Sequence, residues 1–395
     1  MTIVLTGGGT AGHVMPNISL LPYLKKYFDK ICYIGGKNGM EKDIAARYGV
    51  PFFGTETVKL DRAKPLKNLK IPLVLPRAVK EAKKILSEIV PDIVYSKGGY
   101  AALPTVLAAR SLGIPVVAHE SDMTLGVANK LTARFCRRVF LSFENPDYQK
   151  DPKYLYAGSP VRDEIFGYKK AEVKKALGIP DDLPVVLFTG GSLGAQAINE
   201  AVYAALPALT KSYYVLHITG KSGILRDEVE NNPTEKSAHD TAHNKPSAAN
   251  RTETPTAKSA HDTVDKSKPF TANRTEPPTA KSDRYHAFAY HDKIGELFAA
   301  SDLVVSRAGA NTAAELYALG KRTLFIPLPK AASRGDQILN AEYYEKKNAA
   351  RILCQDRLNE ALLDSIRSLL SSPEPKPASK SPNAEIAKMI FEETK

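Results

Sequence analysis

The sequence predicts an α/β protein made of two Rossmann-like, doubly wound domains that face each other across a cleft. The chain has 395 residues, which is enough for two separate cores. Short apolar runs alternate with helix-like segments, as in a parallel sheet with crossover helices, and the alternation restarts near residue 185. A glycine-rich turn follows the first apolar run of each half, where such sheets bind ligands.

The apolar runs place the expected strands and the domain boundary. A first domain over residues 1–158 contains runs at 3–5, 31–34, 93–95, 116–118 and 139–142. A second domain over residues 159–372 begins at Gly158-Ser159-Pro160, with runs at 185–189, 214–219, 303–306 and 323–327 and helix-like segments at 195–209 and 311–319. In such a pair of domains, the loops that leave the strand carboxyl ends line the shared cleft.

Residues 231–283 interrupt the second domain with a different kind of sequence. They are rich in Thr, Ser, Ala, Asn, Pro and Lys and almost lack Leu, Ile and Val. PTEKSAHDT at Pro233 returns as PTAKSAHDT at Pro255 and as PTAKSD at Pro278. Solenoids have such periods, but these repeats carry no apolar face to bury by stacking. We therefore predict a disordered insertion.

Charge and targeting signals limit the possible partners. The formal net charge is +12, and residues 231–283 contribute only +1 of it, from eight basic and seven acidic residues. No apolar run approaches the roughly 20 residues that cross a bilayer. An apolar run follows Met1 at once, without export-signal features, so we expect a cytoplasmic protein. Cys32, Cys136 and Cys354 are predicted to be buried thiols without disulfide or metal roles.

The basic excess suits an anionic membrane surface or a phosphorylated substrate. Residues 64–86 mix Leu66, Leu69, Ile71, Leu73, Val74 and Leu75 with Lys67, Lys70, Arg77, Lys80, Lys83 and Lys84. This pattern fits an anionic bilayer surface, and it also fits an amphipathic helix packed on its own sheet. Basic residues are not interleaved with aromatic residues as in single-strand binding proteins, so we expect no nucleic-acid partner.

The turn TGGGTAGH, residues 6–13, follows the first expected strand and precedes a helix. Glycines there let backbone N–H groups approach an anionic ligand at a helix N-terminus. The spacing of Gly7, Gly9 and Gly12 matches a dinucleotide fingerprint, but the acidic residue expected after the second strand is missing. His13 in the first helical turn is either a packing or capping histidine or a general base, since its pKa lies near working pH.

Three further segments carry polar side chains at strand ends in the second domain. In GGSLG, residues 190–194, backbone donors and the Ser192 hydroxyl suit a diphosphate, although a plain strand-to-helix turn would look similar. SRAGANTAAE, residues 306–315, leads into a helix whose Glu315 would accept both hydroxyls of a ribose. SRGDQ, residues 333–337, is either a reader of sugar hydroxyls or a solvated loop.

In the first domain, SKGGY (96–100) and HESD (119–122) each follow a strand and point to the same sheet edge as His13. We expect the acceptor there. No carboxylate pair or histidine cluster has metal-ligand spacing, so we predict no metal and no cofactor. Helix dipoles and backbone N–H groups would then stabilise a leaving diphosphate.

In combination these motifs resemble the MurG family, the peptidoglycan glycosyltransferases that convert lipid I into lipid II. The resemblance covers nearly everything except the insertion and includes GGTAGH, SKGGY, HESD with GVANK, GSPVR, GGSLGAQ, SRAGANTAAE and SRGDQ. It implies a GT-B fold and transfer of N-acetylglucosamine from its UDP donor to the C4 hydroxyl of lipid I, with inversion. It also implies peripheral association with the cytoplasmic face of the membrane, and a helix within residues 373–395 that returns to the first domain.

The resemblance also implies roles for individual residues. His13 is the expected base, Glu120 is the second candidate, and Tyr100 is placed near the acceptor hydroxyl. Contacts with UDP-N-acetylglucosamine are implied for Thr10, Ala11, Gly12, Asp122, Arg162, Ser192, Ala289, Ala310, Asn311, Glu315 and Gln337. Within that set, Glu315 is assigned to the ribose, Ala289 to the uracil through its backbone, and Gln337 to the sugar hydroxyls.

Two segments depart from the commoner family pattern. Ala11 stands where many members have glycine, and Ser121-Asp122 stands where many read Gln-Asn. Asp122 would place a negative charge beside the donor unless its carboxyl is hydrogen-bonded or protonated. Two alternatives remain open: a related GT-B enzyme that glycosylates diacylglycerol or another acceptor, and a basic nucleic-acid- or membrane-binding protein whose glycine turns are only structural.

Overall fold

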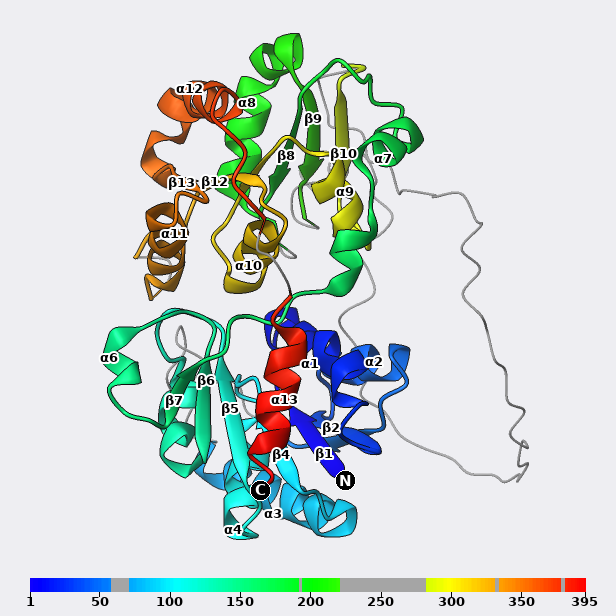
Figure 1. The fold of residues 1–395 in the computed structure, drawn as a ribbon, viewed down its shortest axis with the longest axis vertical. Coiled ribbons are helices and arrows are strands. Elements are labelled where there is room, and N and C mark those ends of the chain that lie inside the picture. Colours follow the sequence, from blue (N-terminus) through cyan, green and yellow to red (C-terminus); the bar gives the residue numbers. More distant parts are fainter. Residues whose placement is uncertain (58–70, 192–193, 221–281, 331–333, 378–380) are drawn as a thin grey trace, which may run out of the picture.

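The fold is described from a computed structural model, which describes residues 1–57, 71–191, 194–220, 282–330, 334–377 and 381–395. Most of the predicted insertion, residues 231–281, lies outside the described residues, as do residues 64–70 and Ser192. Two parallel sheets form the two halves of the molecule, one above the other in Figure 1.

The first sheet has seven parallel strands in the order β3-β2-β1-β4-β5-β6-β7. They are β1 (Thr2–Thr6), β2 (Lys30–Gly36), β3 (Phe52–Thr55), β4 (Ile93–Ser96), β5 (Val116–Glu120), β6 (Arg138–Leu141) and β7 (Tyr154–Tyr156). The strand order reverses between β1 and β4, where Thr6 pairs with Ser96. Loops that leave such a reversal diverge to opposite faces of the sheet and leave a crevice between them.

The second sheet has six parallel strands in the order β10-β9-β8-β11-β12-β13. They are β8 (Val185–Thr189), β9 (Tyr214–Ile218), β10 (Tyr285–Phe288), β11 (Leu303–Ser306), β12 (Arg322–Phe325) and β13 (Arg351–Ile352). Its order reverses between β8 and β11, where Thr189 pairs with Ser306. Each half of the molecule therefore has one ligand crevice, and each predicted glycine turn begins at it.

Helices cover both faces of each sheet (Figure 1). In the first half they are α1 (Ala11–Leu24), α2 (Met40–Arg47), α3 (Ile71–Ile89), α4 (Leu103–Ser111), α5 (Val127–Thr132) and α6 (Pro146–Gln149), with the 3-10 turn η2 (Ala133–Phe135). The second half has η3 (Asp163–Gly167), α7 (Lys170–Ala176), α8 (Gln196–Ser212), α9 (Ile294–Ala300), α10 (Ala310–Ala318), α11 (Asp336–Lys346), η5 (Gln355–Arg357) and α12 (Leu358–Leu370). The final helix is α13 (Asn383–Glu392).

The predicted two-sheet α/β architecture is confirmed. Each of the nine predicted apolar runs overlaps a strand, and three of them extend one or two residues past the strand end, because buried parallel strands are apolar on both faces. Four strands lie outside these runs, all at sheet edges: β10 begins at Tyr285, where strand-like sequence resumes after the insertion, and sequence reasoning missed β3, β7 and β13. The three missed strands are two to four residues long and mostly half-buried or exposed, so they show no continuous apolar run.

Within the described residues, two segments that join the two halves, residues 159–163 and the start of α13, meet at Asn383. Its amide nitrogen donates to the carbonyl of Val161 (2.7 Å), and its amide oxygen accepts from the Val161 N–H (3.1 Å). Beyond this point α13 lies beside α1, and Ile386, Ala387 and Ile390 join the core of the first sheet. The C-terminal helix thus packs with the first half, although it follows the second half in sequence.

Cys32 and Cys136 are buried, but the prediction that Cys354 is also buried was wrong. Cys354 is exposed, because it follows the edge strand β13 and lies just before η5. Among the described helices, none is both long and apolar enough to cross a membrane.

We expect the free energy of unfolding to fall as the pH drops from 6.5 to 5, because two histidines are buried in neutral form. His119 on β5 and His217 on β9 are 0% exposed. Burial lowers the pKa of His119 well below its usual value and lowers that of His217 to about 3. Below pH 6.5 the unfolded chain therefore binds protons that the folded chain does not, which costs about 1.4 kcal/mol per pH unit for each residue.

Urea denaturation followed by circular dichroism at pH 6.5, 5.75 and 5 measures this slope. His217→Gln should remove the His217 contribution and leave that of His119. A free energy of unfolding that does not change over this range would contradict the prediction.

Candidate active site

A cleft of about 1460 Å³ lies between the two halves of the molecule. The first half lines it with the residues around His13 and with Ser121 and Asp122. The second half lines it with residues that follow β8 and β11 and with the first turn of α11. The predicted site residues that line it are Thr10, Ala11, Gly12, His13, Asp122, Arg162, Ala310, Asn311, Glu315 and Gln337.

The glycine turn after β1 brings the start of α1 to the cleft. Gly9 has a φ of +88°, and a Cβ there would lie 2.2 Å from the Tyr100 ring, so this position needs glycine. Tyr100 therefore packs against the turn and does not line the cleft. Ala11, which replaces a common family glycine, is the first residue of α1 and is half-buried there.

His13 occupies the third position of α1, and its Nδ1 is 2.9 Å from the Thr10 hydroxyl. Burial lowers the pKa of His13, and the nearby positive charge of Lys97 lowers it further. When Nδ1–H donates to Thr10, the lone pair of Nε2 is free to accept a proton. The site thus provides a neutral imidazole near neutral pH at the wall of the cleft.

Glu120 lies behind the cleft wall and holds a loop together. Its two carboxylate oxygens accept from the N–H groups of Ser121 (2.9 Å), Asp122 (3.1 Å) and Gly126 (2.7 Å) and from the Asn129 amide (2.9 Å). The residue is 5% exposed and does not line the cleft. This geometry favours a positioning role for Glu120 over the role of a second base.

Arg162 and Glu315 form a bidentate ion pair at the second-domain wall. The Nε and Nη2 atoms of Arg162 donate to the two oxygens of Glu315 at 2.7 and 2.8 Å. Burial disfavours the charge on Arg162, but the hydrogen bond and the negative charge of Glu315, with a smaller contribution from Glu164, together outweigh this and raise the pKa of the guanidinium. Each carboxylate oxygen keeps a second lone pair, which leaves Glu315 able to accept from ribose hydroxyls.

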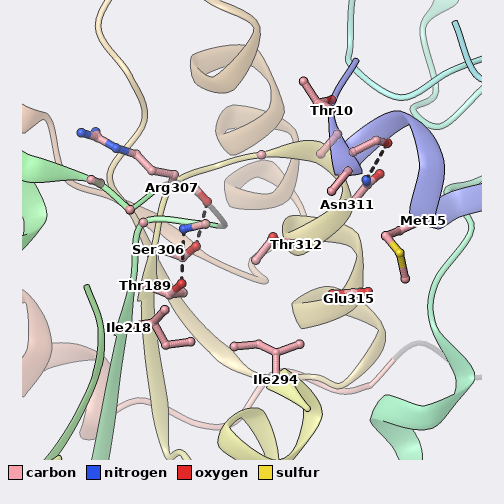
Figure 2. Close-up of a pocket in the computed structure, with 18 of the residues that line it drawn as sticks. Thr10, Met15, Thr189, Ile218, Ile294, Ser306, Arg307, Asn311, Thr312 and Glu315 are labelled. Carbon is pink, nitrogen blue, oxygen red and sulfur yellow. Dashed lines mark hydrogen bonds between the residues drawn. The ribbon is translucent and has the colours of Figure 1, made fainter. Parts of the chain in front are cut away.

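The first turn of α10 joins the two halves of the cleft. The Asn311 amide donates to the carbonyl of Gly12 at 2.9 Å (Figure 2). Figure 2 also shows Thr10 and Met15 from the first half opposite Thr189, Ser306 and Glu315 from the second. The carbonyl end of Gln337 accepts from the Leu328 N–H at 3.1 Å, which leaves its NH₂ group as a donor beside the cleft.

The structure shows which groups contact the Asp122 carboxylate, a question that the sequence left open. Its Oδ1 accepts from the Asn340 amide at 3.0 Å, and its Oδ2 lies 3.9 Å from Arg334. Burial raises the pKa of Asp122, while the hydrogen bond from Asn340 acts in the opposite direction. Asn340, in the second turn of α11, was not singled out by the sequence motifs.

Lys97 is the other residue whose importance sequence reasoning missed. It directly follows β4, is 1% exposed, and has no hydrogen-bond partner for its ammonium. Burial lowers its pKa to about 7. Of the remaining predicted residues, Ala289 follows β10 without lining the cleft, and Ser192 lies outside the described residues. The described His, Cys, Asp and Glu side chains form no group of three that could hold a metal ion.

Comparisons with known proteins agree with this geometry. Residues 3–141 match the glycosyltransferase family 28 N-terminal domain, and residues 185–251 and 257–393 match the glycosyltransferase family 28 C-terminal domain. A UDP-N-acetylglucosamine--N-acetylmuramyl-(pentapeptide) pyrophosphoryl-undecaprenol N-acetylglucosamine transferase of Lachnospira eligens is 38% identical over 93% of this chain and 90% of its own. The transferase of the same name from Clostridium botulinum strain Loch Maree is 39% identical over 91% of this chain and 88% of its own.

Solved structures show the same fold. Acinetobacter baumannii MurG matches with a TM-score of 0.63 at 21% identity and covers 99% of both chains. The calicheamicin glycosyltransferase CalG4 matches with a TM-score of 0.60 at 12% identity, over 100% of this chain and 94% of its own. Two sheets that face a cleft therefore form the GT-B architecture predicted from the sequence.

Proposed function

The chain belongs to the family of UDP-N-acetylglucosamine--N-acetylmuramyl-(pentapeptide) pyrophosphoryl-undecaprenol N-acetylglucosamine transferases, and from this premise we propose how its cleft carries out the transfer. It is a hexosyltransferase that moves N-acetylglucosamine from its UDP donor to lipid I in peptidoglycan synthesis. The observation that supports this function is the cleft itself, where the two topological switch points, each with a glycine turn, face one another.

The donor lies on the second domain, residues 159–372. Backbone N–H groups after β8 and the N-terminus of α8 suit the diphosphate, and Ser192 is proposed to add a hydroxyl. Arg162 and Glu315 hold the nucleotide, with the free lone pairs of Glu315 on the ribose. The backbone of Ala289 meets the uracil, and Ala310, Asn311 and Gln337 surround the sugar.

The acceptor enters from the first domain, residues 1–158, where Thr10, Ala11 and Gly12 lie against the donor sugar. His13 removes the proton from the C4 hydroxyl of the muramyl sugar as that oxygen attacks the anomeric carbon. The bond between the anomeric carbon and the UDP oxygen breaks, and UDP leaves with the electron pair. Attack from the face opposite UDP inverts the anomeric configuration to β. Helix N-termini and backbone N–H groups stabilise the charge that develops on the diphosphate.

We also propose that the enzyme binds an anionic membrane surface, on the cytoplasmic face of the membrane. On α3, Ala82 and Leu86 pack on the first sheet, so part of this segment serves as an ordinary docked helix. Leu73 nevertheless has 68% of its surface exposed, and Arg77, Lys80, Lys83 and Lys84 are exposed along the same helix. Exposed leucine among cations suits peripheral binding to anionic lipid.

Transfer of labelled N-acetylglucosamine from UDP to a lipid I analogue tests the function. A diacylglycerol acceptor runs in parallel, and each reaction is repeated with EDTA. Product on lipid I alone, with or without EDTA, is the expected result. Product on diacylglycerol, or release of UDP without transfer, would overturn the acceptor assignment, and loss of product with EDTA would overturn metal independence.

A further inference from the structure

A short loop of the first domain, residues 121–125, is hydrogen-bonded to the start of α11 in the second domain. The Thr124 hydroxyl donates to Asp336 at 2.6 Å, and the Met123 N–H donates to the Asn340 side-chain oxygen at 3.0 Å. The Asn340 amide then donates to Asp122 at 3.0 Å. Three hydrogen bonds thus cross between the domains within two turns of one helix.

A charge pair accompanies these bonds. The Arg334 guanidinium lies 2.6 Å from Asp336, on its own side of the cleft, and 3.9 Å from Asp122 on the other side. Its Nη1 also donates to the carbonyl of Leu125 at 3.4 Å. Asp122 and Arg334 are each only about one-third exposed, so water screens this pair less than a surface pair. If the domains separated, Arg334 would keep Asp336, but Asp122 would lose Arg334.

Hydrogen bonds within the first domain hold the backbone of this loop. Glu120 accepts the N–H groups of Ser121, Asp122 and Gly126 within the first domain. The backbone of Asp122 is therefore held by the first domain, while its carboxylate is bonded to Asn340 of the second domain. A preformed partner surface lowers the entropy lost when two surfaces meet.

The same contact borders the donor pocket. Gln337 follows Asp336 on α11 and lines the cleft, and Ser121 and Asp122 line it from the opposite wall. We propose that Asp122 and Arg334 form a latch across the cleft that holds α11, and with it Gln337, in position to bind the donor. The segments HESD and SRGDQ, noted separately in the sequence, are the two halves of this latch. The proposal rests on the proposed function, because it takes UDP-N-acetylglucosamine as the ligand of the cleft.

A double-mutant cycle tests the latch on the full-length enzyme. Asp122→Asn, Arg334→Gln and the double variant are compared with wild type for the dissociation constant of UDP-N-acetylglucosamine by calorimetry and for kcat at saturating donor. Each single change should weaken donor binding about fivefold, and the double change should weaken it by about the same factor and not by about 25-fold. Because the latch positions the donor site, the loss should appear in the dissociation constant of the donor.

A matched control is the second interdomain pair, Glu144 and Lys347. Lys347 Nζ lies 3.1 Å from Glu144 Oε2, and the Glu144 and Lys347 side chains are 52% and 34% exposed. Glu144→Gln should change donor affinity less than twofold, because water screens exposed pairs. The charge exchange Asp122→Arg with Arg334→Asp guards against simple misfolding, since it should regain affinity over Asp122→Arg alone.

The outcomes separate the two proposals. Wild-type enzyme that does not bind UDP-N-acetylglucosamine would overturn the proposed function. Wild-type binding combined with single-variant effects that multiply, or with no effect of either single change, would overturn the latch alone. Coupled effects with rescue by the exchange support it.

Discussion

Replacing His13 with alanine is expected to lower kcat by about 10²- to 10⁴-fold, the range for loss of a general base. The dissociation constant of UDP-N-acetylglucosamine should stay near the wild-type value, because the donor contacts come mainly from the second domain. Calorimetry with the donor and transfer assays with a lipid I analogue measure the two quantities separately. If the variant loses donor binding, His13 is not the base but part of the donor site.

The pH profile gives an independent check of the same assignment. A base works only when it is deprotonated, so activity falls as the pH drops through the pKa of His13. Burial and the charge of Lys97 lower that pKa below its usual value near 6.5, so kcat/KM should be flat through neutral pH and fall only below about pH 6.5. Thr10→Val should lower kcat less than the loss of His13, since it removes only the hydrogen bond to Nδ1.

The Glu120→Gln variant tests whether Glu120, the second candidate, is the base. Its carboxylate is occupied by four donors, so this change should disturb the loop at 121–126 and lower the melting temperature. The acid limb of kcat/KM should nevertheless keep its position. If the acid limb disappears in Glu120→Gln but persists in His13→Ala, Glu120 is the base and His13 is not.

Replacing Glu315 with glutamine is expected to weaken UDP binding by about 100-fold or more. The change removes the charged partner of a partly buried Arg162 and a charged acceptor for the ribose. Breaking a buried pair on one side costs about 3–5 kcal/mol, so the free energy of unfolding should fall by an amount approaching that range. Calorimetry with UDP alone and urea denaturation measure the two effects without any acceptor.

Arg162→Lys is the matched variant. Lysine keeps the charge but cannot donate in the bidentate geometry of a guanidinium. UDP affinity and the free energy of unfolding should therefore both fall, but by less than in Glu315→Gln. Wild-type affinity for UDP in Glu315→Gln would contradict the placement of Glu315 in the donor site.

Much of the fold followed from local patterns. The apolar runs that became β1, β4, β8 and β11 are buried on both faces, and a glycine turn or small residues follow β1, β8 and β11. Because parallel strands end at one sheet edge, polar residues placed after them were expected to converge, and ten of the thirteen predicted site residues that the structure describes line one cleft. The edge strands β3, β7 and β13 left no such pattern, since mostly half-exposed strands of two to four residues need no apolar run.

Sequence alone determined the two-sheet α/β class, the glycine turns at both crevices and the chemical types of residue placed there, because these depend on neighbours within a few residues. Tertiary structure alone decided what those residues contact. Arg162 meets Glu315 across 153 positions, and Asp122 meets Asn340 across 218, so neither pairing leaves a local signal. Burial likewise left Lys97 without a partner and enclosed Glu120 among four donors, because both effects arise only when the loops of one sheet edge pack together.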